Sequence, residues 1–136
     1  MYRRDYIQRI IEEVARALRG AMGLNQEGLK VEALRIVQEA YPTFFSMEHE
    51  MVVKMDPDDL LTVFSEKYEL NFEQLEALSK IFEAEASLLV DHNLEEALDR
   101  YKKALVLLTH LEKTDTATFS LERKQRVISI RNMLEG

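Results

Sequence analysis

The chain has 136 residues, of which 46% are hydrophobic and 32% are charged, and its formal net charge is −7. It contains no cysteine, which excludes disulfides, thiolate zinc sites and cysteine nucleophiles. Only four glycines and two prolines occur, so the composition favours long helices around a single core over turn-rich β structure.

The first predicted element is an amphipathic helix from residue 4 to about residue 20. Its apolar residues follow the three- and four-residue spacing of one helix face: Ile7, Ile10, Ile11, Val14 and Leu18. The segment GAMGLN that follows is expected to end this helix, because glycine is a poor helix former.

A second helix is predicted after Asn25, whose side chain is a suitable N-cap. It should end at Tyr41, because a proline at position 42 disfavours helix in the residue before it. Its apolar stripe consists of Leu29, Ala33, Ile36, Val37 and Ala40. The two helices are therefore expected to form a hairpin over residues 4–41.

Residues 43–71 are predicted to form an irregular insertion. Residues 43–55 are apolar without a clear period, which indicates a loop with a short helix, and Asp56 and Pro57 then begin another short helix that ends near Lys67. Three methionines recur every four residues beside two phenylalanines: Met47, Met51, Met55, Phe44 and Phe45. They could form a flexible docking surface, but core packing is the favoured interpretation.

A second hairpin is predicted over residues 72–113, followed by a closing helix over 118–135. Asn71 is the expected cap of the first helix and Asn93 that of the second, where Glu96 is placed to complete a capping box. No segment alternates like a strand. The sequence thus predicts one all-α domain, residues 1–136, with about six helices.

The stretch NLEEALDRYKKALVLL resembles the second helix of a tetratricopeptide repeat. Ala97 and Ala104 stand seven residues apart with Tyr101 between them, and Ala86 and Leu89 match packing positions of the preceding helix. A fainter echo, VEALRIVQEA, lies upstream. The resemblance implies antiparallel hairpins stacked as a right-handed array, with these five residues as packing positions.

The same resemblance implies a groove lined by the first helix of the hairpin. Carried onto residues 72–91, the repeat pattern places four side chains in that groove: Lys80, Glu83, Ser87 and Asp91. An acidic groove would suit a basic peptide. The chain also resembles small bacterial proteins of unassigned function with degenerate repeats of this kind and an RRDYIQRIIEEV-type first helix, a likeness that implies no activity.

The motifs of common chemistries are missing. His49 is flanked by Glu48 and Glu50, but neighbouring helical residues point about 100° apart and cannot converge on one ion, so a surface cluster is expected. Neither a di-iron pattern nor a calcium loop, phosphate-binding glycine loop or HExxH occurs. No catalytic, cofactor or metal site is predicted, and the chain is not expected to be an enzyme.

Charge and hydropathy narrow the expected partners and location. The first 20 and last 16 residues are basic whereas the middle is acidic, which argues against binding to nucleic acid. No apolar run is long enough to cross a bilayer and no secretory signal is recognisable, so a cytoplasmic protein without membrane contact is expected.

The favoured functional hypothesis is a protein-interaction or scaffold module that binds a protein or peptide. The first alternative is a structural homodimer, in which a second copy covers the aliphatic face of the first helix. An enzyme without a recognisable motif is the second alternative, and a buried polar constellation in a cleft would favour it.

Overall fold

The computed structural model describes residues 2–115 and 120–136, and every regular element in these ranges is helical. The elements are α1 (Tyr2–Gln26), α2 (Lys30–Phe45), α3 (His49–Lys54), the 3₁₀ turn η1 (Pro57–Asp59), α4 (Leu60–Thr62), the π-helical turn η2 (Val63–Lys67), α5 (Phe72–Leu89), α6 (Leu94–Thr114) and α7 (Leu121–Glu135). The all-α prediction is confirmed. These ranges hold seven α-helices, two of them short ones in the insertion, where about six were predicted.

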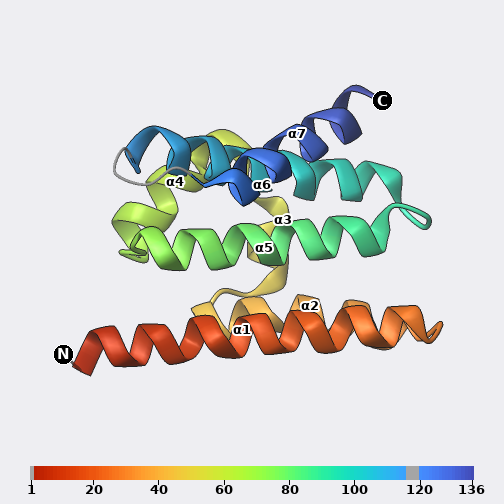
Figure 1. The fold of residues 1–136 in the computed structure, drawn as a ribbon, viewed down its shortest axis with the longest axis horizontal. Coiled ribbons are helices and arrows are strands. Elements are labelled where there is room, and N and C mark those ends of the chain that lie inside the picture. The colour runs from red at the N-terminus through yellow and green to blue at the C-terminus, as the bar shows by residue number, and fades with distance from the viewer. Residues whose placement is uncertain (1, 116–119) are drawn as a thin grey trace.

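The long helices pack in the order of the chain. α1 contacts α2 and α5, α2 also contacts α5, α5 pairs with α6, and α6 contacts α7. In Figure 1, α1 lies along the bottom, α5 in the middle, and α6 and α7 at the top. The short helices connect the two hairpins, with α3 against α2 and α4 against α6. Within the described residues no helix is long and apolar enough to span a membrane.

The centre of the core lies between α5 and α6. Leu78, Ile81 and Phe82 of α5 are completely buried, as are Leu107 and Leu108 of α6. Together with the buried Ala104 and Leu111 of α6, these side chains recur at three- and four-residue intervals, so each helix turns one continuous apolar stripe toward the other. This interface fixes the position of α5, whose other side forms the candidate site described below.

The predicted end of the first helix near residue 20 is wrong, because α1 continues to Gln26. Gly20 and Gly23 lie inside the helix, where a glycine costs roughly 1 kcal/mol relative to alanine. Ala21 between them is completely buried, so tertiary packing offsets that cost. The turn comes at Gly28, whose φ of 84° suits glycine, and Asn25 therefore does not cap α2.

The second helix also runs further than predicted, through Pro42 to Phe45. Tyr41 and Phe45 are both buried, which anchors the additional turn. The helix ends at Ser46 in the left-handed conformation, where the backbone N–H of Ser46 donates to the carbonyl of Pro42. The loss of one amide donor at the proline is thus outweighed by the burial of two aromatic side chains.

The insertion contains the predicted short helices and belongs to the core. Asp56 caps the turn that begins at Pro57, accepting a hydrogen bond from the backbone N–H of Asp58 at 2.8 Å. Met47 is fully buried, and Met51 and Met55 pack partly buried against the core. The methionines therefore pack as expected of core residues.

The two asparagine caps are confirmed, with one difference. Asn71 and Gln74 form a reciprocal capping box at the start of α5. Asn93 accepts from the backbone N–H of Glu96, but the Glu96 carboxylate binds Arg100 at 2.7 Å instead of completing the box. A charged partner one turn along the helix outcompetes the backbone amide.

The last helix, α7, begins at Leu121 with Ser120 as its cap. Residues 118 and 119 of the predicted span 118–135 lie outside the described residues. Val127 and Ile130 are buried, whereas Leu121 and Ile128 point outward and are each 60% exposed.

Candidate functional site

Three of the four predicted groove residues lie along one side of α5. Lys80, Glu83 and Ser87 line cavities between α5 and its neighbours α1 and α7. Lys80 lines both cavities. We call the two cavities together the α5 groove.

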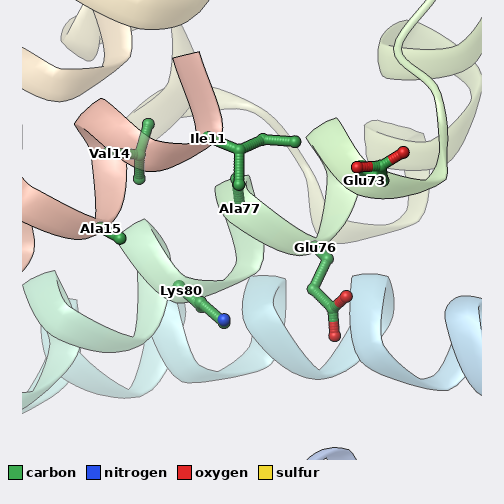
Figure 2. A pocket seen from close by; sticks show the side chains of 7 residues that line it. All are labelled: Ile11, Val14, Ala15, Glu73, Glu76, Ala77 and Lys80. Carbon is green, nitrogen blue, oxygen red and sulfur yellow. The ribbon is translucent and has the colours of Figure 1, made fainter. Parts of the chain in front are cut away.

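The first cavity of the α5 groove lies between α1 and the start of α5 and has a volume of about 130 Å³. Ile11 and Val14 of α1 face Ala77 of α5 across it (Figure 2). Glu76 and Lys80 point away from α1 on the opposite flank of α5 (Figure 2). This end of the groove is therefore apolar toward α1 and charged toward α7.

The second cavity is larger, about 350 Å³, and opens between α1 and α7. Its floor is made by the middle of α5 and by Tyr101 of α6. Its walls come from α1 and α7. The lining residues from these two helices are Met22, Glu122, Arg126 and Ser129.

Ion pairs from α7 hold the wall of the groove in place. Arg126 donates to Glu83 at 2.8 Å and to the hydroxyl of Ser79 at 3.0 Å. Its Nη1 atom is buried without a hydrogen-bond partner among the described residues. Lys80 lies 3.8 Å from the Glu122 carboxylate. The predicted groove residues Lys80 and Glu83 thus already have partners within the chain.

Arg123 forms a second attachment of α7 to α5. Its guanidinium lies 3.3 Å from the Glu76 carboxylate and 5.2 Å from the centroid of the Phe72 ring. The Arg123 side chain is nearly buried, so this contact holds α7 more firmly than an exposed pair would. Glu73, one turn earlier, has no ion pair among the described residues.

Asp91, the fourth predicted residue, lies outside both cavities. It sits in the turn after α5, and its carboxylate is 3.3 Å from the ammonium of Lys30 at the start of α2. The chain leaves the helical path after Leu89, so the groove position inferred from a continuous helix does not apply to Asp91.

The predicted packing residues lie inside the fold. The alanines among them are completely buried, and the two larger side chains are less than 10% exposed. The five are Ala86, Leu89, Ala97, Tyr101 and Ala104. Tyr101 also reaches the groove, where burial and the nearby Glu83 charge raise the pKa of its hydroxyl.

A second polar cluster, which the sequence analysis missed, is buried on the other side of α5. The completely buried carboxylate of Glu85 accepts hydrogen bonds from four side chains. The donors are Gln38 at 3.2 Å, Tyr41 at 2.7 Å, His49 at 2.7 Å and Arg100 at 3.0 Å. We call these five residues the Glu85 cluster.

The hydrogen bonds keep Glu85 ionised. Burial by itself would raise its pKa, but the donors His49 and Tyr41 and the charge of Arg100 lower it below the ordinary value. The pKa of Tyr41 is raised well above its usual range, first by burial and then by the Glu85 charge. Burial disfavours the charge on Arg100, yet Glu85, Glu96 and Asp99 raise its pKa.

The cluster continues along α6 to the end of α3. Asp99 accepts from Arg100 at 2.6 Å and from Lys103 at 2.8 Å. The completely buried ammonium of Lys103 also donates to the backbone carbonyls of Val52 and Val53. It thereby supplies a buried donor at the carboxyl end of α3, where the carbonyl of Val52 also accepts from the backbone N–H of Met55.

His49 is the member of the Glu85 cluster that the sequence analysis placed on the surface, and that prediction is wrong. Its side chain is 29% exposed, and its Nε2 atom donates to Glu85. It borders an open cavity of about 340 Å³ that Gln38 and Arg100 also line. Glu85 lies at a core position of α5, and a buried carboxylate requires hydrogen-bond partners. That position is the signal in the sequence that could have indicated the cluster.

The two sites differ in what they can do chemically. In the Glu85 cluster every charge is matched by a neighbouring side chain, as in an ion network that connects helices. No group of three potential metal ligands occurs among the described residues. The α5 groove combines open volume, apolar patches and carboxylates, which suits contact with another polypeptide. Comparison of the chain with protein-family models, curated proteins and solved structures found no match.

Proposed function

We propose that the protein is a non-catalytic interaction module whose α5 groove binds a segment of a partner protein. The observation that carries this proposal is the groove itself, which runs between α1 and α7 and presents carboxylates beside apolar side chains. A basic segment would complement it, because Glu73, Glu76, Glu83 and Glu122 outnumber the two cations that line it.

We further propose that the helices form a tetratricopeptide-like array. In such an array the first helices of successive hairpins lie side by side, and each second helix packs on the next hairpin. The contacts of α1 with α5, of α2 with α5, and of α6 with α7 support this arrangement. α1, α5 and α7 would then be the first helices, and the α5 groove would lie on their shared face.

The homodimer alternative has less support. It assumed that a second copy covers the aliphatic face of the first helix, but Ile7 and Val14 on that face are buried within the chain. Light scattering at micromolar concentrations tests it directly, and a monomer across that range would count against it. The enzyme alternative has one observation in its favour, because the buried Glu85 cluster borders an open cavity through His49, Gln38 and Arg100. The Glu85 carboxylate itself is hydrogen-bonded by four side chains, as in a structural ion network.

The test of the proposal is a substitution that fills the groove without breaking an ion pair. Ser87 is exposed, and its hydroxyl bonds only to the carbonyl of Ala84 in its own helix, so Ser87→Trp should occupy the second cavity and leave the fold intact. Thr43→Trp, at an exposed position of α2 that borders neither cavity, is the matched control.

Both variants and the unmodified protein would be used for affinity capture from cells of the source organism, followed by mass spectrometry. We expect partners captured by the unmodified protein and by Thr43→Trp to be depleted with Ser87→Trp. Equal capture by all three proteins would contradict the assignment of the groove.

A further inference from the structure

The cavity beside the Glu85 cluster is separate from the α5 groove and has a different chemistry. Its volume of about 340 Å³ lies within the range of small-molecule sites, roughly 300 to 1,000 Å³. Side chains from α2, α3, α5 and α6 contribute to its lining. We call it the His49 cavity, because His49 both lines it and binds the buried Glu85 carboxylate.

The buried carboxylate determines which atoms of its neighbours remain free. Glu85 is ionised and can only accept hydrogen bonds, so His49 must carry its proton on Nε2. The neutral imidazole then has its lone pair on Nδ1. Gln38 donates through its amide nitrogen, which leaves its carbonyl oxygen as an acceptor. Neither side chain has another hydrogen-bond partner among the described residues.

The rim of the His49 cavity adds further acceptors. One oxygen of Glu96 accepts from Arg100, and the other has no partner in the part of the chain that the structure describes. Glu50 is paired with Lys54, but both side chains are exposed and such a pair is weak. Arg100 and Asn93 bring donors to the lining, but the Arg100 charge is already matched by three carboxylates. The cavity is therefore negatively charged and rich in acceptors.

A negatively charged, acceptor-rich cavity selects a ligand that is positively charged and donates hydrogen bonds. A metal ion does not fit, because no group of three potential metal ligands occurs among the described residues. A primary ammonium has three N–H donors and no acceptor, which matches the His49 lone pair, the Gln38 carbonyl oxygen and a rim carboxylate. Val53 and Leu89 complete the lining with apolar surface suited to a short alkyl chain.

We propose that the His49 cavity binds the primary ammonium group of a small aliphatic amine. The ammonium lies against His49 and Gln38, and the alkyl chain lies along Val53 and Leu89. The inference goes beyond the proposed interaction function and does not depend on it, because the α5 groove contributes nothing to this site. A free amine and a lysine side chain of another protein share this chemistry, and the test separates the two sources.

The test titrates the ¹⁵N-labelled full chain with n-butylammonium at constant pH and ionic strength. The ring ¹⁵N resonances of His49 report the tautomer and the hydrogen bonding at Nδ1, and the backbone amides of α2, α3 and α6 locate the site. Butyrate, a short alkyl chain with the opposite charge, is the control ligand. The peptide acetyl-Gly-Lys-Gly-amide presents a lysine side chain for comparison.

We expect butylammonium to shift the Nδ1 resonance and to bind with a Kd of about 1 mM, as suits so small a ligand. Butyrate should bind at least about tenfold more weakly, because like charges repel. His49→Phe keeps a ring at this position but removes Nδ1 and should abolish binding. Far-UV circular dichroism shows whether this variant is folded.

A milder pair of variants tests the rim without touching the buried cluster. Glu50→Gln removes one exposed charge from the cavity and should weaken butylammonium binding about two- to threefold. Glu48→Gln makes the same change at a neighbouring exposed position that does not line the cavity, and it should leave the affinity unchanged.

Two results would overturn the inference. One is an Nδ1 resonance that stays in place at about 10 mM butylammonium, tenfold above the expected Kd. The other is butyrate binding as tightly as butylammonium, which would show that the cavity does not select a cation. Neither result bears on the α5 groove. If the amine binds, an affinity of the lysine peptide above that of butylammonium identifies a protein side chain as the ligand, and a lower affinity identifies a free amine.

Discussion

Replacing Glu85 by glutamine should destabilise the protein strongly while leaving its shape nearly unchanged. The substitution removes the negative charge that faces Arg100, whose side chain is only 3% exposed. Removal of one partner of a buried ion pair costs about 3 to 5 kcal/mol. Arg100 retains Glu96 at 2.7 Å and Asp99 at 2.6 Å, so we expect a loss near the lower end, about 3 kcal/mol.

Urea denaturation followed by circular dichroism at 222 nm measures this loss. A change of about 3 kcal/mol should lower the melting temperature of a chain of this length by about 10 °C. Glu39→Gln, which breaks an exposed pair with Arg35, is the control and should cost less than about 0.5 kcal/mol. If Glu85→Gln costs no more than this control, the assignment of a structural role to the cluster is refuted.

A double-mutant cycle isolates the pair itself. Arg100→Met alone leaves the buried Glu85 carboxylate with three neutral or partly exposed donors, Gln38, Tyr41 and His49. Combined with Glu85→Gln, it removes both charges together. The double variant should therefore be less destabilised than the sum of the two single variants by at least about 1 kcal/mol.

The effect of Glu85→Gln on stability depends on pH with a definite sign. The folded-state pKa of Glu85 is lowered, so its contribution to stability is fully present above the unfolded value of about 4.3. That contribution is lost as the pH falls through the lower folded-state pKa. The difference in stability between the unmodified protein and Glu85→Gln should consequently be constant near neutral pH and shrink below about pH 4.

Three further predictions concern stability, each measured by urea denaturation. Lys103→Met leaves the carbonyls of Val52 and Val53 without their buried donor and should cost about 2 kcal/mol, whereas the exposed Lys102→Met should cost almost nothing. Gly20→Ala adds a methyl group where no atom lies within 4 Å and should stabilise α1 by about 0.5 to 1 kcal/mol; a loss of stability would show that α1 is not continuous there. Asn71→Ala removes the hydrogen bond that the Asn71 side chain accepts from the backbone N–H of Gln74 and should cost about 1 kcal/mol, with no change if α5 frays at its start.

The features that could be predicted from the sequence are those encoded within one turn of helix. Asp56, Asn71 and Asn93 cap helices as expected, because a cap depends on a side chain and the backbone amides that follow it. The predicted helix ends at residues 20 and 41 were wrong, because the real ends depend on packing against residues that are distant in the sequence. The burial of Ala21 and Phe45 outweighs the local preference of glycine and proline.

The candidate site also divides into features encoded within one helix and features that depend on residues distant in the sequence. Lys80, Glu83 and Ser87 share one side of a regular helix, so the helical period was enough to bring them together. The Glu85 cluster combines residues from α2, α3, α5 and α6, and His49 lies 36 positions from Glu85 in the chain. Nothing in one sequence indicates which distant donors meet a buried carboxylate, so this cluster became visible only with the fold.

The attachment of α3 to Lys103 sets an order for folding. The helix has six residues, too few to be stable alone in water, and the side chain that binds its last carbonyls belongs to α6. We therefore expect the α5–α6 pair to form before the segment between the hairpins becomes ordered, and that segment to be the first to detach when the protein is perturbed. Amide hydrogen exchange should then be faster in residues 49–54 than in α5, which would make the join between the two hairpins more labile than the helix pair beside it.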